Sequence, residues 1–136
     1  MGDYLTSGSD YAVADAEGTE EKLADDMPDK ADHLYHCGVR FLTSFLRNDN
    51  QKEDIDKCIL AYESAIHLTP QGHSDMSQRL NMLGVSLLFR FDLTGDLTDI
   101  SDTISYQQKA VHLTPEGHAN MPSQLNNLGN SFQSRF

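Results

Sequence analysis

Histidine and cysteine are the residues of this 136-residue chain best suited to metal binding or catalysis, with six of the former and two of the latter. The histidines fall into three pairs, spaced by three or six residues: His33/His36, His67/His73 and His112/His118. A closed zinc site needs four nitrogen or sulfur ligands, and these spacings bring no carboxylate or thiolate partner with them. We therefore expect no metal and no cofactor.

Two of the histidine pairs belong to a repeated heptapeptide. HLTPQGH at 67–73 returns as HLTPEGH at 112–118, an offset of 45 residues. Histidines that are copied with a repeat are more simply scaffold residues than ligands. Cys37 stands where the other copies carry Leu83 and Leu128, which predicts a small buried apolar residue. The sequence also has no glycine-rich phosphate loop and no nucleophile elbow, so we expect no enzymatic activity.

The repeat extends well beyond the heptapeptide. At the same offset, Asp54-Ile55 matches Asp99-Ile100, and Leu80-Asn81 matches Leu125-Asn126. An earlier copy, shifted by 46 residues, places Leu34 against Leu80 and Gly38 against Gly84. A period in this range is typical of stacked arrays, in which a single repeat cannot bury its own apolar face. Such arrays usually present surfaces rather than perform reactions.

Apolar residues within each repeat follow the period of amphipathic helices. Leu80, Leu83, Leu87 and Phe91 have spacings of three or four residues, as do Ile55, Ile59, Tyr62 and Ile66. The pattern predicts five helices, at about 29–46, 52–68, 75–92, 97–113 and 120–136. Between them, Gly95 can adopt positive φ, Asp96 or Thr98 can cap the next helix, and Pro70 disfavours helix at the residue before it. Connections this short predict antiparallel helical hairpins.

Glycine recurs inside the first helix of each hairpin, at Gly38, Gly84 and Gly129. Glycine costs about 1 kcal/mol relative to alanine in a helix interior. A cost that is repeated in every copy indicates a close approach of the second helix of the hairpin.

These residues carry a resemblance to the tetratricopeptide-repeat family. The run Leu80-x-x-Leu83-Gly84-x-x-Leu87, with the later Ala110 and Pro115, is similar to the signature of that family, although the usual period is 34 residues. The resemblance implies an all-α fold of antiparallel hairpins stacked as a short superhelix of about 2.5 repeats. The repeat domain would cover 28–136, divided into 28–72, 73–117 and a partial 118–136.

The family also implies a function. Tetratricopeptide arrays bind a peptide or helix in a concave groove, at positions one and five residues after the first leucine of the motif. Those positions are Tyr35, Val39, Asn81, Val85, Asn126 and Asn130. We therefore expect a non-catalytic protein–protein interaction scaffold with a protein or peptide partner. None of the six is Lys or Arg, so an acidic C-terminal peptide is not the expected ligand.

The amino-acid sequence of the repeat also suggests an alternative function. The runs at 94–100 and 125–131 are similar to long-period arrays of fungal proteins, which often accompany a caspase-like protease or a nucleotide-binding signalling module. In this interpretation the chain is a regulatory or sensor segment of a larger protein whose catalytic domain is absent here.

The net charge of −11 is concentrated at the N-terminus, where residues 1–26 hold eight acids and one base. That segment lacks apolar periodicity, and we expect 1–27 to be disordered. An acidic chain has no footprint for nucleic acid, and it would be repelled by an anionic membrane. No secretory signal is evident, so the cytoplasm is the expected location.

The last helix raises a separate expectation. Its stripe of Leu125, Leu128, Phe132 and Phe136 is expected to pack on the helix before it, as Leu80 and its stripe would pack on theirs. Apolar atoms left exposed on the other side predict weak self-association through this C-terminal helix. Its more polar outer face is equally typical of a capping helix.

Overall fold

The computed structural model describes residues 27–135, and all regular secondary structure within that range is α-helical. Five helices follow one another: α2 (Met27–Arg47), α3 (Lys52–Leu68), α4 (Met76–Thr94), α5 (Leu97–Leu113) and α6 (Met121–Arg135). The predicted all-α fold is confirmed, and each helix lies within two residues of its expected bounds. The segment 1–27 expected to be disordered lies outside the described residues, except for Met27, at which α2 begins.

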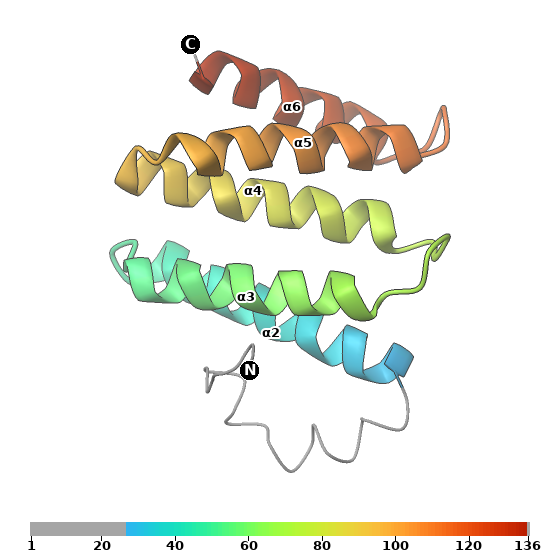
Figure 1. Cartoon of the computed structure of the whole chain (residues 1–136), viewed down its shortest axis with the longest axis horizontal. Helices are drawn as coiled ribbons and strands as arrows, with labels where there is room; N and C mark the ends of the chain where they lie inside the picture. Colours follow the sequence, from blue (N-terminus) through green and yellow to red (C-terminus); the bar gives the residue numbers. More distant parts are fainter. Residues whose placement is uncertain (1–26, 136) are drawn as a thin grey trace. The chain divides into compact units, whose positions relative to one another are not determined.

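The chain divides into two compact units, one ending at Thr69 and the other spanning Pro70–Phe136. In the first unit, α2 and α3 form an antiparallel hairpin (Figure 1). Gly38 permits the close contact between these helices, because a Cβ atom at this position would meet the ring of Tyr62, with Cδ1 at 2.5 Å. Leu34 and Ala65 are buried beside this contact, with Tyr35 packed against them. The predicted close approach at Gly38 is thus confirmed.

The α2–α3 connection accommodates the one extra residue of the first copy. Asp49 and Asn50 both adopt left-handed backbone conformations, with φ of 60° and 54°. Asp and Asn tolerate this region better than other non-glycine residues. The Asn50 N–H donates to the Phe45 carbonyl at 3.1 Å and closes the turn. Across it, the Ser44 hydroxyl donates to Asp54 Oδ2 at 2.9 Å.

The second unit repeats the hairpin with α4 and α5, which lie side by side in Figure 1. A Cβ at Gly84 would lie 2.7 Å from Gln107 Cγ and 3.2 Å from the Thr103 carbonyl oxygen, so α5 passes close to α4 here. Gly95 has φ of 75°, and the Asp96 side chain accepts from the Thr98 N–H at 2.9 Å. The expected left-handed turn and helix cap are both confirmed.

The fully buried side chains of helix α6, which packs on α5, are polar. Gln124 and Ser131 are its buried residues, at 1% and 0% exposure. Gln124 contacts Thr114 at 2.7 Å, and the Ser131 hydroxyl lies 2.7 Å from the amide oxygen of Gln107. Leu125 is 50% exposed. The expectation that the leucine stripe of this helix packs on the preceding one is therefore wrong for Leu125, and Phe136 lies outside the described residues.

The four side chains Gln107, Thr114, Gln124 and Ser131 form a polar seam between α5 and α6. The number of protons that each can donate determines the direction of their hydrogen bonds. The Thr114 hydroxyl lies 2.8 Å from the Ala110 carbonyl as well as 2.7 Å from Gln124, and a hydroxyl has a single proton to donate. The buried Gln124 Nε2 has no other acceptor. With its amide turned so that Nε2 donates to Thr114 Oγ1, the Thr114 proton is left for the Ala110 carbonyl, and the amide oxygen takes the buried place that has no partner. The same reasoning applies to Gln107 and Ser131, since Gln107 Nε2 is also without an acceptor.

Within the described part of the chain, none of the helices combines the length and the apolar character needed to cross a bilayer. The repeated heptapeptides lie in the connections that follow α3 and α5, where the chain turns into the next first helix.

Candidate functional site

The two repeated heptapeptides form loops with the same internal hydrogen bonds. The Thr69 and Thr114 hydroxyls lie 2.6 and 2.8 Å from the carbonyls of Ala65 and Ala110, four residues earlier. Gly72 and Gly117 follow, with φ of 81° and 84°, a conformation that favours glycine. The recurring residues of the heptapeptide thus maintain a loop geometry.

The histidines that end the heptapeptides complete these loops. The His73 N–H donates to the Pro70 carbonyl at 3.1 Å, and the His118 N–H donates to Pro115 at 3.0 Å. The ring Nδ1 of each histidine accepts the backbone N–H two residues later, from Asp75 and from Asn120, at 3.0 Å in both copies. This supports the interpretation of these histidines as scaffold residues.

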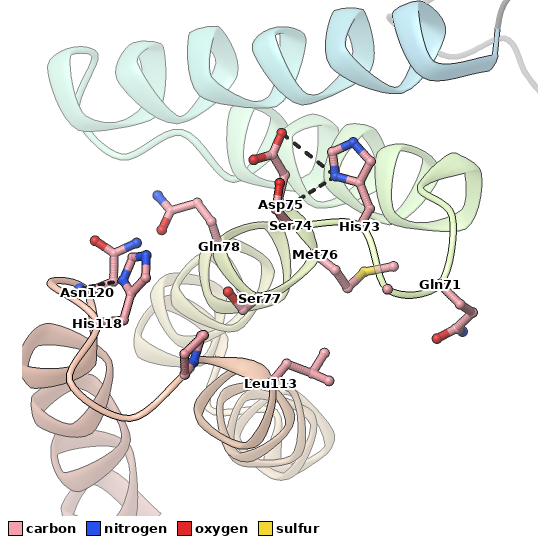
Figure 2. Close-up of a pocket in the computed structure, with 12 residues that line it drawn as sticks. Gln71, His73, Ser74, Asp75, Met76, Ser77, Gln78, Leu113, His118 and Asn120 are labelled. Atoms are coloured by element: carbon pink, nitrogen blue, oxygen red, sulfur yellow. Dashed lines mark hydrogen bonds and ion pairs between the residues drawn. The ribbon is translucent and has the colours of Figure 1, made fainter.

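A pocket of about 590 Å³ lies between the two loops of the second unit, beside the N-terminal turn of α4. His73, Ser74 and Asp75 line one side, while His118 and Asn120 line another (Figure 2). Met76 and Leu113 add apolar surface. The pocket offers hydrogen-bonding groups around a small apolar patch, which suits a polar side chain or a peptide turn better than a large apolar ligand.

The two pocket histidines are poorly placed to act as general bases. A neutral imidazole has one N–H and one lone pair. In His73 and His118 the Nδ1 lone pair already accepts a backbone N–H, so the proton resides on Nε2. Activation of a serine requires a free lone pair directed at the hydroxyl. Ser74 and Ser77 line the pocket, but neither histidine can deprotonate them without losing its loop hydrogen bond.

Among the described residues, histidine, cysteine and carboxylate side chains form no group of three or more that could hold a metal ion. Cys37 and Cys58 are both buried thiols outside any disulfide, and burial was expected for Cys37. The Cys37 sulfur lies 3.3 Å from Arg40 Nη2, which donates to it. These thiols serve the packing of the α2–α3 hairpin.

The six expected groove residues differ in their exposure. Val39 on α2 is exposed and Tyr35 is half-buried, with its ring 5.4 Å from that of Tyr62. In the second unit, Asn126 and Asn130 on α6 are exposed and Val85 on α4 is half-buried. Five of the six positions therefore have some surface available to a ligand.

Asn81 departs from this pattern. It is only 6% exposed, and its Oδ1 is buried without a hydrogen bond. The expectation that Asn81 is an exposed groove residue is wrong. Because its repeat counterpart Asn126 is exposed, the difference lies in their surroundings and not in the residue type.

The surface of α6 around Gly129 is exposed. The leucine stripe had predicted that Leu125, on this surface, packs on the preceding helix. A Cβ at Gly129 would meet nothing within 4 Å, in contrast to Gly38 and Gly84. Leu125 precedes it by one helical turn and is exposed, whereas Leu34 and Leu80 are 3% and 1% exposed. The signal was available in the repeat, since the glycine marks the side of the helix on which its hairpin partner packs.

Comparison of the chain with protein-family models, with curated proteins and with solved structures found no match.

Proposed function

We propose that this chain is a tetratricopeptide-like interaction module that binds a polypeptide through the exposed positions of its first helices and performs no reaction itself. The observation that carries the proposal is that the same helix–helix contacts recur in both hairpins, while exposed side chains lie on the first helices. The two hairpins make equivalent contacts at Gly38 and Gly84, and they pair Asp54 and Asp99 with the preceding helix.

The outward positions of the first helices vary only in part between the copies. One position is valine in both hairpins (Val39 and Val85) and asparagine in α6 (Asn130), and the other is Tyr35 in the first copy and asparagine in the later two (Asn81 and Asn126). A recurring frame with exposed side chains that can change from copy to copy is typical of a binding scaffold. The adjacent Asn126 and Asn130 side chains can each donate to and accept from an extended peptide backbone.

The arrangement of the pocket supports a non-catalytic role. Its two histidines are engaged in loop hydrogen bonds, and the hydroxyl, amide and carboxylate groups beside them can form hydrogen bonds with a peptide. A bound polypeptide would gain affinity from hydrogen bonds to the asparagines and from apolar contact with Val85.

A peptide selection tests this function. The full chain, immobilised, is used to select binders from a displayed library of random peptides, and the dissociation constant of a selected peptide is measured by fluorescence anisotropy. The double variant Asn126→Ala/Asn130→Ala should weaken binding about thirtyfold, since two lost hydrogen bonds of about 1 kcal/mol each remove about 2 kcal/mol of binding free energy.

The matched control is Gln108→Ala/Lys109→Ala, two exposed residues of α5, which should leave affinity unchanged. Failure to select any peptide, or equal loss of affinity in both double variants, would contradict the proposed function.

A further inference from the structure

The pocket between the two heptapeptide loops of the second unit lies outside the six groove positions. On the premise of the proposed function, that the chain binds a polypeptide, we propose that this pocket holds a neutral amide side chain of that polypeptide, from glutamine or asparagine. The hydrogen-bonding groups that line the pocket, their charge and their position on α4 each support this assignment.

Two N–H groups of known position line the pocket. His73 and His118 accept backbone N–H groups at Nδ1, so each neutral imidazole carries its proton on Nε2 (Figure 2). Neither Nε2 has a hydrogen-bond partner among residues 27–135. Each of these nitrogens can only donate, so the ligand atom that meets it must be an acceptor.

One group that can only accept lines the same pocket. Asp75 directly precedes α4, and its side chain does not cap that helix. Its Oδ2 lies 3.5 Å from Arg79 Nη2 and 3.9 Å from His73 Nδ1, whereas Oδ1 has no partner in the described part of the chain. Arg79 is buried, and its positive charge offsets that of the Asp75 carboxylate. The open oxygen can accept an N–H from a ligand that carries no charge.

A charged side chain would leave one of these groups unsatisfied. Lysine and arginine only donate, so they cannot pair with the imidazole N–H groups. Aspartate and glutamate only accept, and they would meet the Asp75 carboxylate. An amide has N–H donors and a carbonyl acceptor, so it pairs with both kinds of group and adds no charge. A serine or threonine hydroxyl does both through a single atom, which reaches fewer groups in a pocket of about 590 Å³.

The rest of the lining suits the stem of such a side chain. The Ser74 and Ser77 hydroxyls have no partner among the described residues, and a hydroxyl can turn to either end of an amide. Leu113 and Pro115 are exposed apolar residues that can pack against the methylene groups of the ligand. Glutamine has the longer stem and is therefore the better fit.

The two loops share a frame but differ at pocket positions. The threonine, glycine and histidine that maintain the loop geometry are the same in both copies. In contrast, Ser74 and Asp75 correspond to Ala119 and Asn120, 45 residues later. The carboxylate acceptor thus comes from one loop only, which gives a bound amide a defined orientation.

The pocket lies at one end of the surface proposed to bind the polypeptide. Gln78 lines it from the first turn of α4, and Val85 of the groove is seven residues further along, on the same side of the helix. Asn120 lines it from the position before α6, the helix that carries Asn126. Seven helical residues span about 10 Å, the length of about three residues of extended peptide. A peptide in contact with Val85 would therefore place its amide residue about three positions away.

N-acetylglutamine methylamide serves as the probe, because it reproduces the side chain with a peptide bond on each side. It is titrated into the full chain, and binding is followed by the backbone amide shifts in nuclear magnetic resonance spectra. We expect saturable shifts centred on residues 73–78 and 116–120, with a dissociation constant on the order of millimolar. The N-acetyl methylamides of glutamate, lysine and methionine are the matched ligands and should bind at least about fivefold more weakly.

Two variants of the chain each remove one recognition group. Asp75→Ala removes the acceptor, and His118→Asn removes the Nε2 donor while the asparagine oxygen can still accept the loop N–H two residues later. Each should raise the dissociation constant of the glutamine probe about fivefold. Asp102→Ala, at an exposed carboxylate of α5, is the control and should leave it unchanged.

Asn126→Ala/Asn130→Ala separates this pocket from the proposed groove. It should leave binding of the glutamine probe unchanged, whereas it weakens binding of a selected peptide. Glutamine or asparagine should also recur at one position of the peptides that the chain selects, and Asp75→Ala should abolish the preference for them over leucine there. If the selection yields no peptide, the proposed function fails, and the glutamine probe still tests the pocket.

Three results would overturn the inference. The first is equal binding of the glutamine probe and of the glutamate, lysine or methionine probe. The second is binding that neither Asp75→Ala nor His118→Asn weakens. The third is the absence of shifts in both loops at the highest probe concentration, or shifts centred elsewhere in the chain.

Discussion

Arg90 of α4 grips Asp99 of α5 with two hydrogen bonds, from Nε to Oδ2 at 2.8 Å and from Nη2 to Oδ1 at 2.9 Å. The carboxylate is almost completely buried, whereas the arginine reaches partly into solvent. In the first hairpin the equivalent aspartate, Asp54, accepts a hydrogen bond from the Ser44 hydroxyl instead of from an arginine. The aspartate thus has a partner on the first helix in both hairpins.

Removing Arg90 should lower the stability of the protein more than the loss of an exposed ion pair does. Arg90→Ala leaves the Asp99 carboxylate buried with two hydrogen bonds lost, and we expect the free energy of unfolding to fall by about 2–3 kcal/mol. Urea denaturation followed by circular dichroism measures the effect. Lys109→Ala, an exposed basic residue on α5, is the control and should change stability by less than about 0.5 kcal/mol. Equal effects would show that the pair contributes nothing.

The helix glycines should respond to alanine with opposite signs. Gly38→Ala places a methyl group against the Tyr62 ring, and overpacking should outweigh the gain in helix propensity, for a net loss of about 1–2 kcal/mol. Gly129→Ala meets no neighbouring atom and should stabilise the chain by up to about 1 kcal/mol. Denaturant titration of both variants provides the comparison. Destabilisation by Gly129→Ala would mean that the face of α6 is already occupied.

Tyr62 should make the first unit sensitive to alkaline pH. Burial, together with the nearby Cys58 and Tyr35, raises the pKa of the Tyr62 hydroxyl above its ordinary value of 10.0. The folded state therefore favours the neutral phenol, and this contribution to stability is complete below pH 10 and is lost as pH rises further. Its hydroxyl has no hydrogen bond of standard geometry, and the neighbouring Cys58 thiol is a weak partner.

Tyr62→Phe should accordingly keep the stability of the chain at neutral pH and reduce its decline above pH 10. Thermal melting at pH 7 and at several alkaline values tests this. Tyr106→Phe, at a half-buried tyrosine of α5, is the matched variant and should decline with pH as the parent does. A parallel decline in all three proteins would rule out Tyr62 as the cause.

The polar seam between α5 and α6 should show strong coupling between its members. Thr114→Val leaves the buried Gln124 amide without its partner, and we expect a loss of about 1–3 kcal/mol. Thr114→Val/Gln124→Leu removes both polar groups and should recover much of that loss. A double-mutant cycle on urea denaturation measures the coupling. Strictly additive effects would show that the two side chains do not depend on each other.

Helix boundaries were predictable because the residues that set them act locally. Gly95, Asp96 and Pro70 each constrain one or two backbone angles, whatever the rest of the fold does. The close approach at Gly38 and Gly84 could also be foreseen, because a glycine that weakens its own helix in successive copies is offset by a neighbouring helix passing close to it.

The faces of α6 could not be assigned in the same way. Leu125, Leu128 and Phe132 form an apolar stripe that fits either of two neighbouring helices, and hydropathy alone does not tell them apart. Helix α6 in fact buries Gln124 and Ser131, which form hydrogen bonds with Thr114 and with Gln107 of α5. The burial of Asn81 was missed for a related reason, since exposure depends on what surrounds a residue and not on the residue itself.

The loops made by the repeated heptapeptide have a consequence for how such a chain can grow. Each loop carries its own threonine and histidine hydrogen bonds and a glycine at positive φ, so its shape depends mostly on residues that are copied with the repeat. A 45-residue segment duplicated in the gene would therefore arrive with its joint already built. A duplicated repeat therefore brings the loop that connects it to the next repeat, and no further sequence change is needed there. A designer could add hairpins in the same way.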